Sequence, residues 1–209
     1  MGRSIIWDWN GTLLDDVQYT YSIVNEMLVK RGKPALSYEQ YKNVFSFPIR
    51  EYYKKIGFEF KNDEEYYSIV EEFNCLYERN IQICKLQQDA ISVMSFFQVQ
   101  GYSQFLLSGL NHKDLIKAVN RFKIAKYFEE IVGSKSSDAN DKVLNCKKMF
   151  RRNKIKHEDA IFIGDTTADY DLAAVMGCRC ILTSNGHQTR SILGVKETRI
   201  IKELKELKQ

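Results

Sequence analysis

The spacing of hydrophobic positions changes along the chain and divides it into three parts. A short apolar run over residues 4–8 is typical of a buried strand. Between about residues 16 and 85, apolar positions recur with helical spacing, as at Val17, Tyr21, Val24 and Leu28. From residue 88 onward, short apolar runs alternate with helical patterns. The pattern therefore predicts one strand, then a helical segment, then a mixed region.

Start and stop signals support several helices in the middle segment. Ser37 is placed to cap a helix N-terminus, and Pro48 can occupy the first turn of a helix that runs to Gly57. Asn62 precedes acidic residues, as at the start of another helix, which is expected to end near Asn80. We expect no strand between residues 16 and 85.

The region after residue 88 predicts a parallel sheet. Strands are expected near residues 102–108, 131–132, 160–163 and 178–183, with helices between them. Strands that alternate with helices form right-handed crossovers in a doubly wound α/β fold. Because the strand at residues 4–8 must join this sheet, we expect residues 1–15 and 86–209 to form the core and residues 16–85 to form an inserted helical cap.

Composition and charge narrow the class of protein. The 209 residues are 44% hydrophobic, and the net charge of +4 is mild. Val143, Leu144, Met149 and Phe150 interleave with the basic run over residues 147–156, as a buried apolar stripe would require. The run is therefore interpreted as a solvated helix face, and no nucleic-acid partner is expected. We expect no signal peptide, no apolar run is long enough to span a bilayer, and the five cysteines form no CxxC motif. We expect a cytoplasmic protein with free thiols.

Polar side chains follow three of the expected strands. Asp8 ends the first strand, Ser108 ends another, and Asp165 and Asp169 follow a third. Ligands of doubly wound folds bind at the carboxyl ends of the strands, where these residues are expected to meet. A single aspartate at a strand end is more often a helix cap, but the joint occurrence favours a site.

These motifs resemble those of phosphatases in the haloacid-dehalogenase-like (HAD) superfamily, in the branch with a helical cap after the first motif. The first motif is the run from Asp8 to Thr12, the second is Ser108 followed by Gly109, and the fourth is Asp165 with Asp169. The third is a lysine, for which Lys142 fits best and Lys135 is the competitor. Residues 45–58 also resemble the cap of phosphoglycolate-phosphatase-like members.

The resemblance implies a mechanism and a Mg²⁺ cofactor. Asp8 would be the nucleophile that forms an aspartyl phosphate. Asp8, the backbone carbonyl of Asn10 and Asp165 would hold Mg²⁺, which prefers oxygen ligands. Asp169 would hold a ligand water or orient Lys142.

The same resemblance suggests how a phosphoryl group would bind. Thr12, Ser108 and backbone amides near Gly109 would contact its oxygens, helped by the N-terminus of the helix after Ser108. Lys142 would neutralise charge on Asp8 and on the phosphoryl group. Arg50 is a candidate for meeting a substrate anion from the cap, with a plain surface role as the alternative.

Asn10 departs from the family pattern. Most phosphatases of this type carry an aspartate there, which protonates the leaving group and then deprotonates the attacking water. An asparagine side chain can do neither. His187 follows another strand end, where it either lines the mouth of the pocket or lies in an exposed loop.

Two classes of function remain. The first is a Mg²⁺-dependent phosphatase of a small phosphorylated metabolite. The second is a catalytically impaired phosphate-ligand-binding or regulatory protein on the same scaffold, which Asn10 favours. Intact Asp8, Asp165 and Lys142 favour the enzyme. The sequence indicates no protein partner or particular substrate, and dehalogenase, phosphomutase and phosphonate hydrolase activities rank lower.

Overall fold

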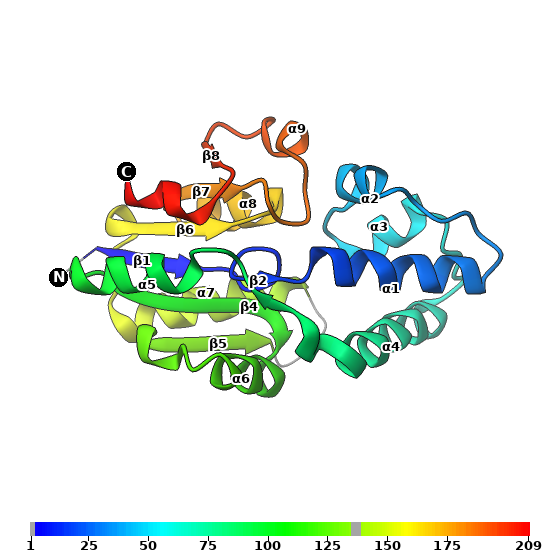
Figure 1. Cartoon of the computed structure of the whole chain (residues 1–209), viewed down its shortest axis with the longest axis horizontal. Coiled ribbons are helices and arrows are strands. Elements are labelled where there is room, and N and C mark those ends of the chain that lie inside the picture. The colour runs from blue at the N-terminus through cyan, green and yellow to red at the C-terminus, as the bar shows by residue number, and fades with distance from the viewer. Residues whose placement is uncertain (1–2, 135–138) are drawn as a thin grey trace.

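The computed structural model describes residues 3–134 and 139–209. Its centre is a six-stranded parallel sheet in the order β5-β4-β1-β6-β7-β8 (Figure 1). The strands are β1 (Ser4–Trp7), β4 (Ser103–Asn111), β5 (Glu130–Ser134), β6 (Ala160–Gly164), β7 (Arg179–Thr183) and β8 (Arg199–Ile201). The predicted α/β doubly wound fold is confirmed.

Helices cover both faces of this sheet because side chains alternate along each strand. Ile5 and Trp7 of β1 lie in one hydrophobic cluster with α5 and α6, whereas Ile6 lies in a second cluster with α7 and α8. The covering helices are α5 (Ala90–Val99), α6 (His112–Arg121), α7 (Ala139–Asn153) and α8 (Thr167–Val175), and a short α9 (Arg190–Leu193) follows β7. Single 3-10 turns are η1 (Ile81–Ile83), η2 (Ala125–Tyr127), η3 (His157–Asp159) and η4 (Leu204–Lys208).

Four helices between β1 and the rest of the sheet pack around a third hydrophobic cluster. They are α1 (Val17–Lys30), α2 (Tyr38–Val44), α3 (Ile49–Lys55) and α4 (Asp63–Asn80). The Ser37 hydroxyl accepts a hydrogen bond from Gln40 N, which confirms the predicted N-cap. The Asn62 side chain accepts one from Glu65 N, and the predicted start of a helix there is confirmed. We call this group the helical insertion.

The helical insertion leaves and rejoins the core at one place. A two-stranded antiparallel ribbon pairs β2 (Leu14–Asp15) with β3 (Lys85–Leu86). In Figure 1 the insertion lies beyond the end of the sheet at which β1 and β6 finish, next to the loop that follows β7. The carboxyl ends of the central strands therefore face the insertion, and the candidate site lies between them.

Other expectations concern the surface and the cysteines. All five cysteines are free thiols, as the sequence predicted. The basic side chains of α7 at Lys147, Lys148 and Arg151 are exposed, in agreement with a solvated face. Leu144 was expected in the buried stripe of this helix, but it is 51% exposed, because the residue lies on the outer face of α7. Within the described ranges, no helix has the length and hydrophobicity needed to cross a bilayer.

Candidate active site

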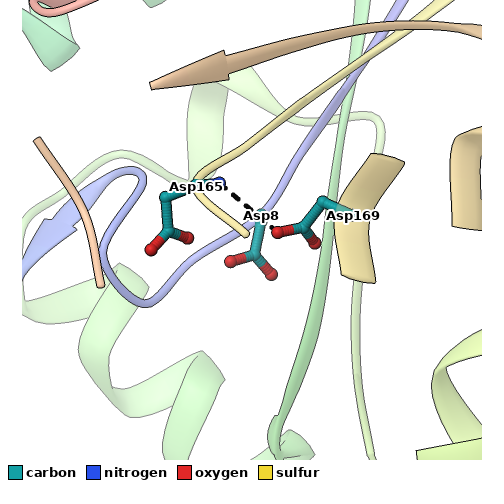
Figure 2. A group of neighbouring side chains, drawn as sticks. All are labelled: Asp8, Asp165 and Asp169. Atoms are coloured by element: carbon teal, nitrogen blue, oxygen red, sulfur yellow. Dashed lines mark hydrogen bonds between the residues drawn. The ribbon is translucent and has the colours of Figure 1, made fainter. Parts of the chain in front are cut away.

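Three carboxylates meet where β1 and β6 end. Asp8 follows β1, Asp165 follows β6, and Asp169 lies in the first turn of α8. The two strands are neighbours in the sheet, and Asp8 N donates to Ile163 O at 2.9 Å. Each of the three side chains offers a carboxylate oxygen within 4.8 Å of the others (Figure 2). The structure therefore brings together the three aspartates that the sequence singled out.

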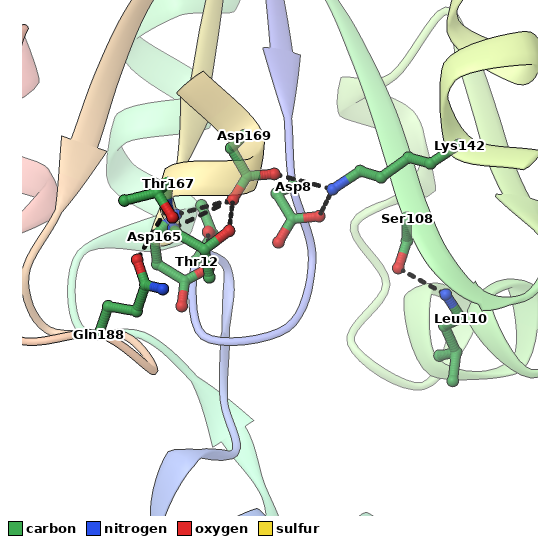
Figure 3. Close-up of polar contacts among 10 residues, drawn as sticks. Asp8, Thr12, Ser108, Leu110, Lys142, Asp165, Thr167, Asp169 and Gln188 are labelled. Atoms are coloured by element: carbon green, nitrogen blue, oxygen red, sulfur yellow. Dashed lines mark hydrogen bonds and ion pairs between the residues drawn. The ribbon is translucent and has the colours of Figure 1, made fainter. Parts of the chain in front are cut away.

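Lys142 joins this cluster from α7. Its Nζ donates to Asp8 Oδ1 at 2.6 Å and to Asp169 Oδ1 at 2.8 Å (Figure 3). Both carboxylates are largely buried, with side-chain exposures of 13% for Asp8 and 5% for Asp169. Of the two lysines considered, Lys142 reaches the nucleophile candidate, and Lys135 lies outside the described residues.

Asp169 holds the loop after β6 while it holds Lys142. Its Oδ2 accepts hydrogen bonds from Thr166 Oγ1 at 2.7 Å, Thr166 N at 3.1 Å and Asp165 N at 3.3 Å. The contact from Thr166 N is one half of a capping box at the N-terminus of α8. One carboxylate thus fixes the backbone beside Asp165 through one oxygen and orients the lysine through the other.

Asp165 is fixed by the loops around it. Its Oδ1 accepts from Thr12 Oγ1 at 3.0 Å, and its Oδ2 accepts from His187 N at 2.7 Å. A Cβ atom on Gly186 would lie 2.2 Å from Asp165 Oδ2, and one on Gly11, where φ is +69°, would lie 2.3 Å from the same atom. Glycine is therefore required at both positions for the backbone to approach this carboxylate.

The described contacts of Thr12 differ from the predicted role. Thr12 was expected to bind a phosphoryl oxygen, but its side chain is fully buried and donates to Asp165. A hydroxyl has one proton to donate, so in this arrangement Thr12 positions a metal-ligand candidate and has no proton left for a phosphoryl oxygen.

Ser108 and Gly109 lie within a strand that is longer than predicted. β4 continues to Asn111, beyond the predicted strand end at Ser108, and α6 begins at His112. The Ser108 hydroxyl is buried and accepts from Leu110 N at 3.0 Å. In Figure 3 Ser108 lies across Asp8 from Asp165, which keeps it as a candidate contact for a bound oxyanion.

Arg50 does not join the cluster. Its guanidinium forms an ion pair with Asp63 and lies over the ring of Tyr66, with 4.5 Å from Cζ to the ring centroid. Both partners belong to the helical insertion. Of the two roles considered for Arg50, these contacts favour the surface role, because its guanidinium is paired within the insertion.

Burial and mutual repulsion govern the ionisation of the carboxylates. Burial, opposed by Lys142 and reinforced by the charges of Asp169 and Asp165, raises the pKa of Asp8 to about 7. Burial also raises the pKa of Asp165, although His187 opposes it. For Asp169, burial would raise the pKa, but Lys142 and the Thr166 hydrogen bonds outweigh it and lower the pKa. The pKa of Lys142 is raised despite burial, because Asp169 and Asp8 favour its ammonium form.

Asp16 is a central residue that the sequence analysis did not single out. Its carboxylate is 1% exposed and accepts from Asn10 Nδ2 at 2.8 Å, Gly11 N at 2.8 Å and the Tyr77 hydroxyl at 2.7 Å. Burial would raise its pKa, but the charge of His187 and these hydrogen bonds outweigh it and lower the pKa. The only sequence signal was a second aspartate after Asp15, which fits an ordinary N-cap equally well.

His187 is buried, so the interpretation as an exposed loop residue is wrong. Its side chain is 5% exposed, and its Nε2 lies 3.4 Å from Asp16 Oδ1. Its Nδ1 is 2.8 Å from the hydroxyl of Tyr41, and its ring stacks on Phe45 at 4.8 Å between centroids. Tyr41 and Phe45 come from the helical insertion, which makes His187 a contact between the insertion and the core.

The cluster has the chemistry of a site for a hard divalent cation. Among the described residues it sets three carboxylates, Asp8, Asp165 and Asp169, against the ammonium of Lys142. Asp165 receives hydrogen bonds from a hydroxyl and a backbone amide, and no lysine or arginine of the described residues forms an ion pair with it. A cation bound by oxygen ligands would offset this excess negative charge.

Comparisons with known proteins agree with this geometry. The family model of haloacid dehalogenase-like hydrolases matches residues 5–183. The phosphoglycolate phosphatase of Pseudomonas fluorescens is 22% identical over 193 residues, which are 88% of this chain and 70% of that protein. A haloacid dehalogenase-like family hydrolase of Streptococcus pneumoniae has a TM-score of 0.81 at 18% identity, covering 99% of this chain and 96% of that one.

The fold alone does not determine the reaction. Protein tyrosine kinase A of Mycobacterium tuberculosis superposes with a TM-score of 0.80 at 17% identity, over 99% of this chain and 97% of that chain. Its name describes a kinase, although its fold is shared with hydrolases. The match over residues 5–183 shows that this chain belongs to the haloacid dehalogenase-like hydrolase family. The resemblance and the enzyme class predicted from the sequence are confirmed.

Proposed function

We propose that this protein is a Mg²⁺-dependent phosphatase that acts on a small phosphorylated metabolite through an aspartyl-phosphate intermediate on Asp8. The observation that carries the proposal is the pair of contacts from Lys142 Nζ to Asp8 and Asp169, beside Asp165. A lysine that reaches one buried carboxylate while a second carboxylate anchors it is suited to phosphoryl transfer, because that reaction depends on positioning and charge neutralisation.

Asp8, Asp165 and the backbone carbonyl of Asn10 would hold Mg²⁺ at this site. The cation would neutralise charge on the phosphoryl group and let the anionic Asp8 approach it. Lys142 forms a hydrogen bond with Asp8 Oδ1, and Oδ2 accepts none from the described residues. The residues that fix Asp165 are Thr12 and His187, through the hydrogen bonds described above.

Asp8 would be the nucleophile of the first of two displacements and the leaving group of the second. A carboxylate oxygen of Asp8 forms a bond to phosphorus as the bond from phosphorus to the leaving oxygen breaks. Water then attacks phosphorus, the acyl phosphate bond breaks, and inorganic phosphate and the Asp8 carboxylate are released. Ser108 and the backbone near Gly109 would contact the phosphoryl oxygens from the β4 side.

The helical insertion would act as a cap over this site. It lies next to the carboxyl ends of β1 and β6 and contacts the core at His187 through Tyr41 and Phe45. A cap that closes over a substrate excludes water and completes the pocket. Under this proposal the chain divides into a core of residues 1–15 and 86–209 and a cap of residues 16–85.

A screen of phosphorylated metabolites with Mg²⁺ tests the proposed function. Phosphoglycolate belongs in the panel because the curated relatives at 20–22% identity are phosphoglycolate phosphatases. We expect phosphate release that stops in excess EDTA and in the Asp165→Asn variant, with the fold checked by circular dichroism. Full activity in EDTA would contradict the metal requirement. The absence of phosphate release from every compound in the panel would contradict the proposed phosphatase activity.

A phosphate-ligand-binding or regulatory protein is the second candidate. Asn10 favours it, since both hydrogens of its amide are engaged by Asp16 and Tyr77 and it can neither give nor take a proton. Binding of a phosphorylated compound with Mg²⁺, measured by calorimetry and with no phosphate released over hours, would establish this alternative.

A further inference from the structure

The side-chain amide of Asn10 is held from two sides. Its Nδ2 donates to Asp16 Oδ2 at 2.8 Å and to the Tyr77 hydroxyl at 2.6 Å. The Tyr77 hydroxyl in turn donates to the same Asp16 oxygen at 2.7 Å. We call these three side chains the Asn10 triangle.

The chemistry of the partners fixes which way the amide of Asn10 points. An ionised carboxylate only accepts hydrogen bonds, so the nitrogen and not the oxygen of the amide must face Asp16. The Tyr77 hydroxyl gives its one proton to Asp16 and therefore accepts from Asn10. Both N–H groups of Asn10 are used, and Oδ1 is the one side-chain atom of Asn10 that can still bond to a ligand.

Asp16 is a rigid anchor for the Asn10 triangle. Besides its contacts with Asn10 and Tyr77, it accepts from Gly11 N at 2.8 Å and from Thr20 Oγ1 at 3.4 Å. It lies in the core-to-insertion connection, directly before α1. A buried carboxylate with this many donors has a fixed orientation, because loss of any one hydrogen bond leaves its buried charge with fewer donors to offset desolvation.

Tyr77 links the Asn10 triangle to the helical insertion. It lies near the end of α4, is 7% exposed, and packs against the rings of Tyr19 and Phe73 at 5.7 Å between centroids. Its hydroxyl reaches the loop that also carries Asp8. The orientation of Asn10 therefore depends on where α4 lies.

We propose that Asp16 and Tyr77 are positioning residues that hold Asn10 with its carbonyl Oδ1 free to accept a hydrogen bond from the water or hydroxyl group of the reacting ligand. Tyr77 makes this orientation conditional on the position of the helical insertion. The inference rests on the proposed phosphatase function. It gives Asn10 a role that an amide can perform, which is to orient a nucleophile or leaving group without moving its proton.

Three variants separate this role from simple loss of packing. Tyr77→Phe and Asp16→Asn each remove part of the Asn10 triangle with little change in volume. Tyr19→Phe is the matched control, because the Tyr19 hydroxyl bonds the same helix at Leu76 O (2.8 Å) and Tyr77 O (3.1 Å) and makes no contact with Asn10. Thermal unfolding of all three variants measures what each change costs the fold.

Two measurements report on the positioning itself. The first is the ¹H–¹⁵N signal of the Asn10 side-chain amide, assigned by its loss in Asn10→Ala and recorded without substrate. We expect Tyr77→Phe and Asp16→Asn to shift it and Tyr19→Phe to leave it in place. The second is steady-state hydrolysis with Mg²⁺, where the first two variants should lose about tenfold in kcat with KM nearly unchanged, and the control should lose neither.

The outcomes distinguish this inference from the proposed function. An unmoved amide signal in Tyr77→Phe, or an equal loss of kcat in Tyr19→Phe, would overturn the positioning role even if the protein is a Mg²⁺-dependent phosphatase. A shifted signal in a protein that hydrolyses no phosphate ester would overturn the proposed function and support the linkage of Asn10 to the insertion. A shifted signal together with the selective loss of kcat would support both.

Discussion

The amide nitrogen of Asn10 lies 2.8 Å from a carboxylate oxygen of Asp16, and both residues belong to the segment that leads from the nucleophile candidate Asp8 into the helical insertion. The carboxylate and the amide thus form a matched pair, with a donor facing an acceptor. The family pattern has an aspartate at position 10, whereas this chain has an amide there that faces the carboxylate of Asp16.

This pairing changes what is expected of Asn10→Asp. From the sequence alone, the substitution should restore an acid and raise turnover by roughly 10²- to 10⁴-fold. In the structure it would set a carboxylate at hydrogen-bond distance from Asp16, and two such groups cannot both stay ionised. We therefore expect Asn10→Asp alone to fall well short of that gain.

The reciprocal double variant tests the pairing directly. Asn10→Asp with Asp16→Asn keeps one amide and one carboxylate in contact, and it should exceed either single variant in turnover. Pre-steady-state phosphate release on an aryl phosphate measures the slow phase in all four proteins. Peptide mass analysis controls for deamidation at Asn10-Gly11. A single Asn10→Asp variant as fast as the double variant would contradict the pairing.

Lys142 should matter for turnover more than for stability. Lys142→Met keeps much of the apolar stem but removes the ammonium from between Asp8 and Asp169. We expect kcat to fall by about 10²- to 10³-fold, as for loss of one electrostatic contact in an active site. Lys147→Met on the same helix is the control, since Lys147 is exposed. Equal kinetics for the two variants would exclude the proposed role of Lys142.

Affinity for Mg²⁺ should rise with pH. Burial raises the pKa of Asp8 to about 7, so this carboxyl is partly protonated near neutral pH before a metal binds. A metal ligand must be deprotonated, so binding should release protons. Below that pKa, the affinity should rise by up to about tenfold per pH unit for each proton displaced. Calorimetry in two buffers of different ionisation enthalpy measures the release. An affinity that does not change between pH 6 and pH 8 would contradict this account.

The buried pair of His187 and Asp16 should make stability depend on pH. Burial would lower the pKa of His187, but Asp16 outweighs it, and the pKa rises above its ordinary value of 6.5. The stabilisation should then be complete below about pH 6.5 and be lost as pH rises through the raised pKa. We expect urea unfolding in EDTA to show this decline in the wild type, and a smaller decline in His187→Asn. His157→Asn serves as the control, and equal declines in the two variants would contradict the assignment to His187.

The sequence predicted the residues at the strand ends better than it predicted their partners. Asp8, Asp165 and Asp169 were found because a parallel sheet brings the ends of its strands to one edge. The proximity of the strand ends follows from the topology of the sheet, and the alternation of strands and helices in the sequence predicts that topology. Lys142 came from the family resemblance. The choice between Lys142 and Lys135 followed from the expected start of a helix, and α7 carries Lys142 to Asp8.

Contacts made across the chain could not be predicted in the same way. Tyr77 meets Asp16 over 61 residues, and Tyr41 meets His187 over 146. Nothing in local spacing distinguishes these tyrosines from the other aromatic residues of the helical insertion. The ion pair of Arg50 with Asp63, which favours its surface role, could not be predicted for the same reason, since it depends on how α3 and α4 pack.

The covalent step on Asp8 is the central claim, and trapping the intermediate tests it most directly. Because Asn10 cannot activate water, the aspartyl phosphate should accumulate with an aryl phosphate and Mg²⁺. Reduction with borohydride after a denaturing quench converts an aspartyl phosphate to homoserine, and peptide mass spectrometry locates it. The account predicts homoserine at position 8, absent in EDTA and absent when substrate is omitted. Sustained phosphate release with an unmodified Asp8 peptide, or undiminished turnover in Asp8→Asn, would contradict it.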